Sequence, residues 1–169
     1  KNALPKVIVF NANTQEGSSM VRVLSEKGLA VVAVVRVFTS RNTKRLMKLK
    51  NVEVQVADLN NMEAVKQAGQ GCQQAFLVTK YWEHFENWIE EGMAQVVLRA
   101  SSEVGISRLV LATFEDTSAL RSRGLKSQLM PTADGRIFPK FEGMDSIQEQ
   151  AKGLKNISVT HMFTSYLDD

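Results

Sequence analysis

Residues 6–24, KVIVFNANTQEGSSMVRVL, decide the fold predicted for this chain. The apolar run at residues 7–10 is short and β-branched, as in a strand that is buried within a parallel sheet. Met20, Val21 and Leu24 then recur at the spacing of a helix. The stretch therefore predicts a strand, a tight turn and a helix.

The turn between this strand and this helix keeps one glycine, Gly17. In a dinucleotide-binding fold, a glycine-rich turn holds the pyrophosphate at the helix N-terminus and allows the backbone to approach it closely. Asn11 and Thr14 stand where the first two glycines of a G-x-x-G-x-x-G loop would fall. The loop thus has the length and position of a phosphate-binding turn but lacks most of the glycines that bring its backbone close to a phosphate.

Further along the chain, apolar strands alternate with amphipathic segments. Strands are predicted at residues 30–35, 52–56, 74–78 and 108–112, and a sixth at 157–161. Helices are predicted at residues 42–49, from a cap at Asn60 through residue 68, at 82–104 and at 141–152. This rhythm predicts a single Rossmann-like α/β domain over residues 1–169, with a doubly wound parallel sheet in the order 3-2-1-4-5(-6).

The pattern breaks down over residues 113–137, which are polar and rich in serine and basic side chains. A loop of this length is uncommon in a compact domain unless it serves a function or is disordered. The few apolar anchors favour a mobile loop over a functional flap.

Length and composition fit one globular domain. The chain has 169 residues, of which 44% are hydrophobic and 23% charged, enough for a substantial core. A single cysteine, Cys72, excludes an internal disulfide and a cysteine-built zinc site. With no apolar run long enough for a signal peptide or a membrane span, a cytoplasmic or nuclear location is expected. The chain begins at Lys1 without a methionine, so we expect a fragment or a trimmed form of a longer protein.

Charge is distributed unevenly along the chain. Residues 27–52 carry seven basic side chains and no acidic one: Lys27, Arg36, Arg41, Lys44, Arg45, Lys48 and Lys50. A solvated helix face is the commoner meaning of such a run, and a phosphate or nucleic-acid patch is the alternative.

Three segments of the sequence resemble a known family. The run VIVFNANTQEGSSMVRVLSEKG, the segment Val78-Thr79-Lys80-Tyr81-Trp82-Glu83 and the start of a helix at Phe141-Glu142-Gly143 resemble the NmrA-like branch of the atypical short-chain dehydrogenase/reductases, most closely the NmrA-like redox-sensor proteins. The resemblance covers most of the chain, although full-length members are much longer. It implies a Rossmann domain that binds NADP(H). It also implies a regulator that binds partner proteins according to the presence of the cofactor, mostly without a working dehydrogenase site.

The resemblance assigns the cofactor-binding residues one by one. It places the glycine loop on Asn11, Asn13, Thr14, Gln15, Glu16 and Gly17. In the family, an arginine after the second strand binds the 2′-phosphate of NADP(H), and the resemblance places that arginine on Val37. Arg36 stands one position earlier, so on an extended strand its side chain would face the opposite way. Arg41 is then either a substitute or an exposed arginine at the start of a helix, and Asp58 either approaches the adenine or caps a helix, the second being favoured. Thr79, Lys80 and Tyr81 stand where the family has Thr-Asn-Tyr beside the nicotinamide half.

A reductase-type acid–base set is missing from the sequence. The wider superfamily uses a serine, a tyrosine and a lysine, but no Tyr-x-x-x-Lys motif occurs here, Ala112 stands where the serine would be, and Met144 stands where the resemblance expects a lysine. His84 and His161 have no metal-ligand partner at a useful spacing, so no metal is expected.

Two functions remain open from the sequence. One is a non-catalytic regulator or redox-sensor relative that works through protein binding, with weakened or lost NADP(H) binding. The other is a functional NADP(H)-binding sensor or an NADPH-dependent reductase. We expect a regulatory protein partner and a possible homodimer through an exposed strand edge, but neither specific nucleic-acid recognition nor membrane insertion.

Overall fold

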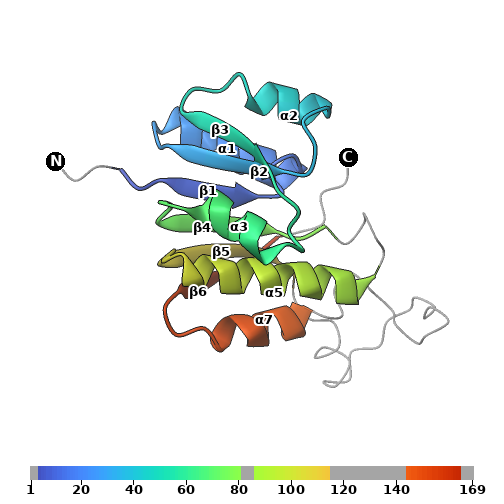
Figure 1. Ribbon diagram of the computed structural model, residues 1–169. Coiled ribbons are helices and arrows are strands. Elements are labelled where there is room, and N and C mark those ends of the chain that lie inside the picture. Colours follow the sequence, from blue (N-terminus) through green and yellow to red (C-terminus); the bar gives the residue numbers. More distant parts are fainter. Residues whose placement is uncertain (1–3, 81–85, 115–143, 165–169) are drawn as a thin grey trace.

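A computed structural model describes residues 4–80, 86–114 and 144–164 of the chain. Its centre is a six-stranded sheet in the order β3-β2-β1-β4-β5-β6 (Figure 1). All neighbouring strands pair in parallel. The predicted Rossmann-like doubly wound sheet, including the sixth strand, is confirmed. The strands are β1 (Val7–Phe10), β2 (Val31–Val35), β3 (Val52–Val56), β4 (Gln74–Val78), β5 (Arg108–Thr113) and β6 (Ser158–Phe163).

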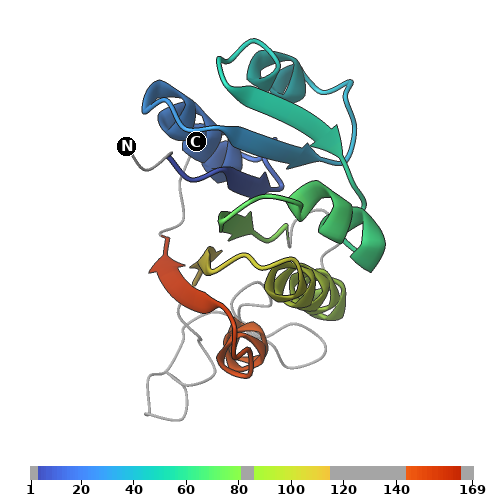
Figure 2. The ribbon, with the colours of Figure 1, turned by 60° about the vertical axis from the view of Figure 1, so that its left-hand side comes forward.

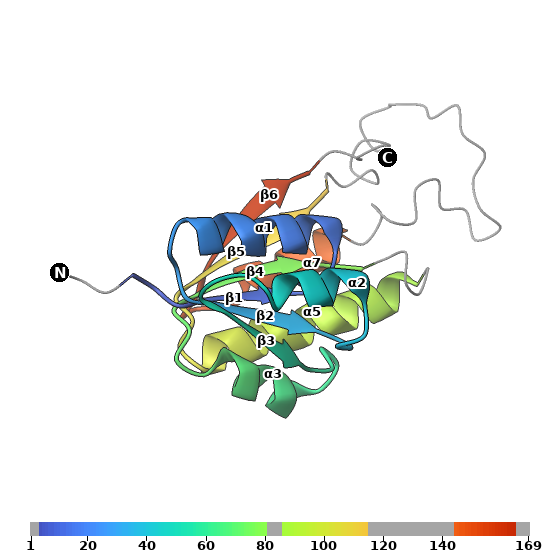
Figure 3. The same ribbon diagram turned by 90° about the horizontal axis from the view of Figure 1, so that it is seen from above.

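Helices cover both faces of the sheet (Figure 3). One layer holds α1 (Gln15–Glu26) and α2 (Arg41–Leu46), which contact each other. The other layer holds α3 (Met62–Gly69), α5 (Asn87–Glu103) and α7 (Met144–Lys152), packed side by side. In the turned view of Figure 2, β3 and β6 lie at opposite edges of the sheet.

The strands divide their side chains between two cores because successive residues of a strand face opposite ways. Ile8, Phe10, Val32 and Val34 enter the core under α3, α5 and α7. The residues between them, such as Val9 and Ala33, enter the core under α1 and α2. Both faces are therefore apolar, which explains why β1 and β2 read as unbroken apolar runs.

Helix α1 ends at a glycine, as the sequence predicted. Gly28 has a φ of 78°, a left-handed conformation that costs glycine little. Its amide donates to the Ser25 carbonyl at 2.9 Å, and the Leu29 amide donates to the Leu24 carbonyl at 3.1 Å. These two bonds are those of a Schellman motif, which satisfies the last carbonyls of the helix. The motif turns the chain directly into β2.

Several predicted boundaries need correction. Helix α2 begins at Arg41 and ends at Leu46 rather than spanning residues 42–49. The cap of α3 is Asn61 rather than Asn60, because the Asn61 side chain accepts the Ala64 amide at 3.1 Å. Thr113 belongs to β5 and not to the following loop. The rest of that predicted loop, from residue 115 on, lies outside the described residues, as does the predicted helix start at residue 141.

Helix α5 carries an unexpected acidic residue on its buried side. Glu90, in the first turn of this helix, is only 2% exposed. Its neighbour Glu91 accepts a hydrogen bond from Ser146 Oγ of α7 at 3.2 Å, so the Glu91 side chain faces α7. None of the helices in the described ranges is both long and apolar enough to cross a membrane.

Candidate functional site: a cleft at the carboxyl ends of the strands

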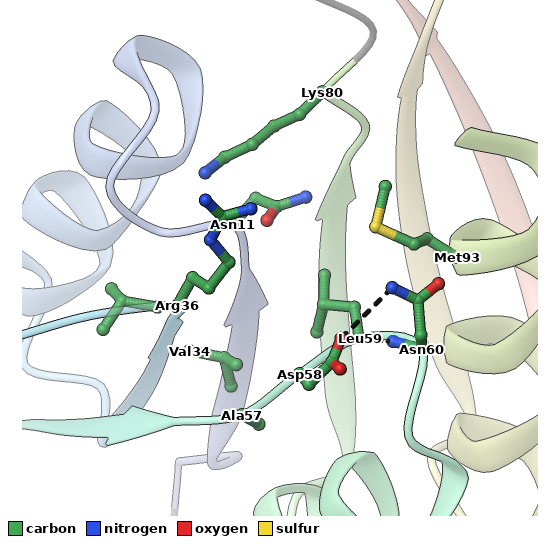
Figure 4. A pocket seen from close by; sticks show the side chains of 10 residues that line it. Asn11, Val34, Arg36, Ala57, Asp58, Leu59, Asn60, Lys80 and Met93 are labelled. Carbon is green, nitrogen blue, oxygen red and sulfur yellow. Dashed lines mark hydrogen bonds between the residues drawn. The ribbon is translucent and has the colours of Figure 1, made fainter. Parts of the chain in front are cut away.

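A cleft of about 270 Å³ opens at the carboxyl ends of four neighbouring strands (Figure 4). Its described lining residues come from the ends of β1 and β2, from the segment after β3, from one residue after β4, and from α5: Asn11, Val34, Val35, Arg36, Ala57, Asp58, Leu59, Asn60, Lys80 and Met93. The strand order changes direction between β1 and β4. Open α/β sheets bind their ligands at this point of reversal, outside the carboxyl ends of the strands.

Asn11 keeps the turn after β1 but closes the space beside it. Its φ of 53° lies in the left-handed region, which asparagine tolerates better than most residues. Its side-chain Nδ2 donates to the Val78 carbonyl at the end of β4, at 2.7 Å. The amide therefore bridges β1 and β4 across the point of reversal. A glycine here would leave that space open to a phosphate.

Thr14 takes up a donor that a phosphate would otherwise use. It is the N-cap of α1, with its φ at −73°, so its backbone conformation does not require glycine. Its Oγ1 accepts the Gly17 amide at 3.0 Å and donates to the Asn11 carbonyl at 2.9 Å. Free amides at a helix N-terminus attract a phosphate, and this cap engages one of them, the Gly17 amide.

Gly17 is required by packing within the turn. A Cβ at this position would lie 2.5 Å from the Asn11 carbonyl oxygen and 2.9 Å from Thr14 Oγ1. The one signature glycine that the chain keeps is thus explained by the close approach of α1 to the turn, without any ligand.

Two basic side chains line the cleft. Arg36 follows β2 and Lys80 follows β4, on either side of Asn11 in the strand order. In Figure 4 the ammonium group of Lys80 and the guanidinium group of Arg36 extend toward the same place, next to the Asn11 side chain. Arg36 lines the cleft, although the strand period placed its side chain on the opposite face from Val37. Val37 is 46% exposed and is not among the described lining residues.

Asp58 lies on the opposite wall of the cleft. Its Oδ1 accepts the backbone amide of Asn60 at 2.9 Å and the Asn60 side-chain Nδ2 at 3.2 Å. The favoured prediction that Asp58 caps α3 is wrong, since Asn61 is the cap. Asp58 instead shapes the short turn that brings Asn60 to the cleft.

The remaining predicted residues lie around the cleft rather than in its described lining. The backbone carbonyl of Asn13 accepts Asn42 Nδ2 at 3.1 Å, and its own buried Oδ1 has no hydrogen-bond partner among the described residues. Gln15 and Glu16 form the first turn of α1, and Thr79 precedes Lys80 half-buried. Arg41 is exposed at the start of α2, and Tyr81 lies outside the described residues.

Sequence reasoning missed part of the lining. Asn60 was assigned to a helix cap, although its place just after β3 was a usable signal, because residues that follow parallel strands gather at one edge of a sheet. Met93 comes from the middle of α5 and reaches the cleft only through helix packing. No sequence pattern would have shown that contact.

The end of β5 has apolar surroundings where a reductase would need a proton donor. Thr113 is 1% exposed, and its hydroxyl donates to Met144 Sδ at 3.4 Å. Met144, 2% exposed, occupies the position that the resemblance gives to a lysine. Neither this thioether nor the buried methyl of Ala112 exchanges protons.

Within the described part of the chain, no group of three or more histidine, cysteine or acidic residues is placed to hold a metal ion. Cys72 is buried, and the resulting desolvation raises the pKa of its thiol. The pKa of Lys66 is raised as well, chiefly by its hydrogen bonds to Glu103 and Glu63. Neither Cys72 nor Lys66 lines the cleft.

Comparison with known families places the chain. The model of the NmrA-like family matches residues 5–126, which is more than half of the sequence. The chain belongs to the NmrA-like family. The predicted resemblance to the NmrA-like family is confirmed, and the match contains the first two of the three segments above.

Solved structures of this family share the fold at low sequence identity. NmrA, a negative transcriptional regulator, in complex with NADP gives a TM-score of 0.74 at 19% identity over 94% of this chain. A double variant of NmrA, in which an asparagine and an alanine are replaced by glycine, gives 0.77 at 17% identity over 94% of this chain. The triphenylmethane reductase of Citrobacter sp. complexed with NADP(H) gives 0.69 at 18% identity over 95%. The chain spans 44% of each NmrA chain and 49% of the reductase chain.

The residues present fit a dinucleotide only in part. The cleft lies at the place expected for its adenosine half, with Asp58 and Arg36 in the lining. The loop, in contrast, uses the Gly17 amide and the space beside Asn11 for its own hydrogen bonds. These are the parts of the loop that the pyrophosphate of a dinucleotide would otherwise use.

Proposed function

We propose that this chain is a non-catalytic NmrA-like regulator that acts by binding a protein partner and that has weakened or lost NADP(H) binding. The observation that carries the proposal is the pair of hydrogen bonds in the turn after β1. Asn11 Nδ2 binds the Val78 carbonyl, and Thr14 Oγ1 accepts the Gly17 amide. Both bonds use space or donors that a pyrophosphate needs.

The end of β5 supports the non-catalytic part of this proposal. A reductase needs a group that gives or takes a proton at the substrate carbonyl. Thr113 is buried and hydrogen-bonded to Met144 Sδ, and the sequence has no Tyr-x-x-x-Lys motif. A relative that is a negative transcriptional regulator, NmrA, fits a role of this kind.

A functional NADP(H)-binding sensor, or an NADPH-dependent reductase, is the second candidate. Arg36 and Lys80 favour it, because basic side chains in the cleft attract the phosphates of a nucleotide. NmrA has been crystallised with NAD and with NADP, and the Citrobacter reductase with NADP(H). The two candidates differ in how tightly the unaltered chain binds NADPH.

An NADPH titration separates the candidates, with the melting temperature and the NADPH fluorescence as readouts. A ligand at a hundredfold excess over its dissociation constant stabilises a protein by about 2.7 kcal/mol. We expect little stabilisation of the unaltered chain at millimolar NADPH. The double variant Asn11→Gly with Thr14→Gly should bind NADPH measurably better, since it opens the space beside β4 and frees the Gly17 amide.

Asn13→Gly serves as the matched control, because it adds a glycine to the same loop without removing either hydrogen bond. Micromolar binding of NADPH by the unaltered chain would contradict weakened binding and favour the second candidate. If the double variant gains no affinity for NADPH, the loop is not the cause of weak NADPH binding. Val37 and Met144, where the resemblance expects an arginine and a lysine, would then be the residues to test.

A further inference from the structure

A second hollow lies on the face of the sheet that carries α1 and α2. Helix α1 contacts β1, β2 and β4 on this face, and α2 contacts α1 and β3 (Figure 2). Within the described ranges, no further helix of this layer lies over β5 and β6. The uncovered part of the sheet forms a groove of about 490 Å³ between α1 and β6, called here the α1–β6 groove.

The strand register places polar side chains in one row at the amino ends of the strands. Leu109 of β5 enters the core under α3, α5 and α7, so its neighbours Arg108 and Val110 face the groove. Arg108 pairs in register with Gln74 of β4 on one side and with Ser158 of β6 on the other. The three polar side chains therefore lie next to one another on the floor of the groove.

A mainly apolar row lies two residues further along the same strands. There, Val110 pairs in register with Phe76 of β4 and with Thr160 of β6. Met20 and Leu24 of α1 line the groove beside this row. The groove thus has a polar end that carries one cation and a body that is mostly apolar.

Arg108 is a cation without a partner in the described part of the chain. It is exposed, and its guanidinium group makes no hydrogen bond or ion pair with a described residue. No acidic side chain is among the described lining residues of the groove. A guanidinium group binds a carboxylate with two parallel hydrogen bonds, and the amide of Gln74 and the hydroxyl of Ser158 are further donors beside it. The polar row therefore suits a carboxylate.

The size and the lining of the groove define the rest of the ligand. A volume of about 490 Å³ lies within the roughly 300–1,000 Å³ of pockets that hold small molecules. A ligand that matches both parts of the groove carries one carboxylate on an apolar chain. A second charged group on the ligand would lie against the apolar row, where its desolvation would be costly.

We propose that the α1–β6 groove binds an amphipathic monocarboxylate of the medium-chain fatty-acid class. Arg108 holds the carboxylate, and the apolar row with the adjoining side of α1 holds the chain. This inference goes beyond the proposed function, because the groove and the cleft at the carboxyl ends of the strands share no described lining residue.

Isothermal titration calorimetry with decanoate, octanoate and decanol tests the proposal. The unaltered chain should bind decanoate about tenfold more tightly than octanoate, since two more CH₂ groups are buried. Arg108→Gln should weaken the binding of decanoate about fivefold, as expected for the loss of a partly exposed ion pair, and leave the binding of decanol unchanged. Arg108→Lys should retain part of the affinity for decanoate, because it keeps the charge without the two parallel hydrogen bonds.

Arg22→Gln is the matched control, because Arg22 is an exposed arginine of α1 that is not among the described lining residues. It removes the same charge and should leave the affinity for decanoate unchanged. Thr160→Trp fills the apolar row from an exposed position of the edge strand β6, and it should weaken the binding of both decanoate and decanol. The melting temperature of each variant without ligand shows whether it is folded.

The proposal is overturned if the unaltered chain does not bind decanoate, if Arg108→Gln and Arg22→Gln have equal effects, or if Thr160→Trp leaves the affinity for decanoate unchanged. Sedimentation of the chain without ligand detects another occupant, a second copy of the chain. A dimer that Thr160→Trp converts to a monomer would assign the groove to self-association and would also overturn the proposal.

A titration of decanoate at saturating NADPH separates the groove from the cleft. NADPH should leave the affinity for decanoate unchanged, because the two sites share no described lining residue. Competition between the two ligands would place the carboxylate in the cleft and overturn the proposal. The affinity for NADPH itself bears only on the proposed function.

Discussion

At the scale of single residues, the turn after β1 shows how a phosphate-binding loop keeps its shape while its donors change partners. Asn11 supplies the left-handed conformation, Thr14 caps α1, and Gly17 allows the helix to approach the turn. Each residue satisfies a local requirement of the backbone. The hydrogen bonds and the packing of the turn are therefore complete without a ligand.

Gly17 offers a direct test of this account. In Gly17→Ala, the added Cβ would lie 2.5 Å from a backbone carbonyl oxygen, a contact that a side-chain movement does not relieve. We expect a loss of about 2–3 kcal/mol in the free energy of unfolding, measured by urea denaturation.

The control for this variant is Gly92→Ala, since Gly92 lies inside α5 and a Cβ there would meet no atom within 4 Å. This change should leave the chain as stable or raise its stability by up to about 1 kcal/mol, because alanine favours a helix over glycine. Similar effects of the two substitutions would mean that the turn is not tightly packed.

Residue types alone predicted the shape of this turn but not its hydrogen bonds. Asparagine at position 11 fits the positive φ that the turn has there, and glycine at position 17 fits the close packing of α1 against the turn. The bond from Asn11 to Val78 joins residues 67 positions apart, so it depends on the pairing of β1 with β4. The direction of the Arg36 side chain depends in the same way on how the chain leaves β2, which the strand period did not predict.

At the scale of elements, the start of α3 shows why strands were predicted closely and helix ends were not. Residues 58–61 read DLNN, with three side chains that are able to cap a helix. The structure divides them: Asp58 closes a turn onto Asn60, and Asn61 caps the helix. Adjacent residues of similar chemistry compete for one role, and the geometry of the preceding turn decides between them.

The cap of α3 yields a second prediction. Asn61→Ala should lower the free energy of unfolding by about 1 kcal/mol, because the Ala64 amide loses its acceptor. Asn60→Ala, next to it and equally exposed, should change stability by less than about 0.5 kcal/mol. Chemical denaturation of both variants checks the assignment. A larger effect at Asn60 would restore the cap that the sequence suggested.

The strands were easier to predict because both of their faces are buried. A strand between two helix layers needs apolar residues at every position, and β1 and β2 show such a run. At the edge of the sheet, β3 alternates polar and apolar residues, but its period of two still indicates a strand. Met93 and Met144 reach their sites through the packing of α5 and α7, and sequence periodicity carries no information about that packing.

At the scale of the whole molecule, basic side chains gather along α2, beside the edge strand β3. Helix α2 and its flanks expose Arg41, Lys44, Arg45, Lys48 and Lys50, and no acidic residue interrupts them. Large apolar side chains are exposed in the same segment, with Val37 at 46%, Phe38 at 49% and Met47 at 56%. A surface that combines positive charge with apolar contacts suits an acidic segment of a partner protein, which is the partner that we propose for this chain.

Charge reversal on α2 provides the last prediction. In the variant Arg41→Glu with Lys44→Glu, association with an acidic partner should be abolished, and any residual binding should become insensitive to salt, because opposite charge attracts the partner and salt screens that attraction. A fluorescently labelled polyglutamate peptide serves as the probe, and fluorescence anisotropy at low and at high salt as the measurement. The variant Lys152→Glu with Lys155→Glu changes the net charge by the same amount at exposed lysines in and just after α7, and it should lose little binding. If the two double variants lose binding equally, only the net charge of the chain matters, and a partner site on α2 has to be abandoned.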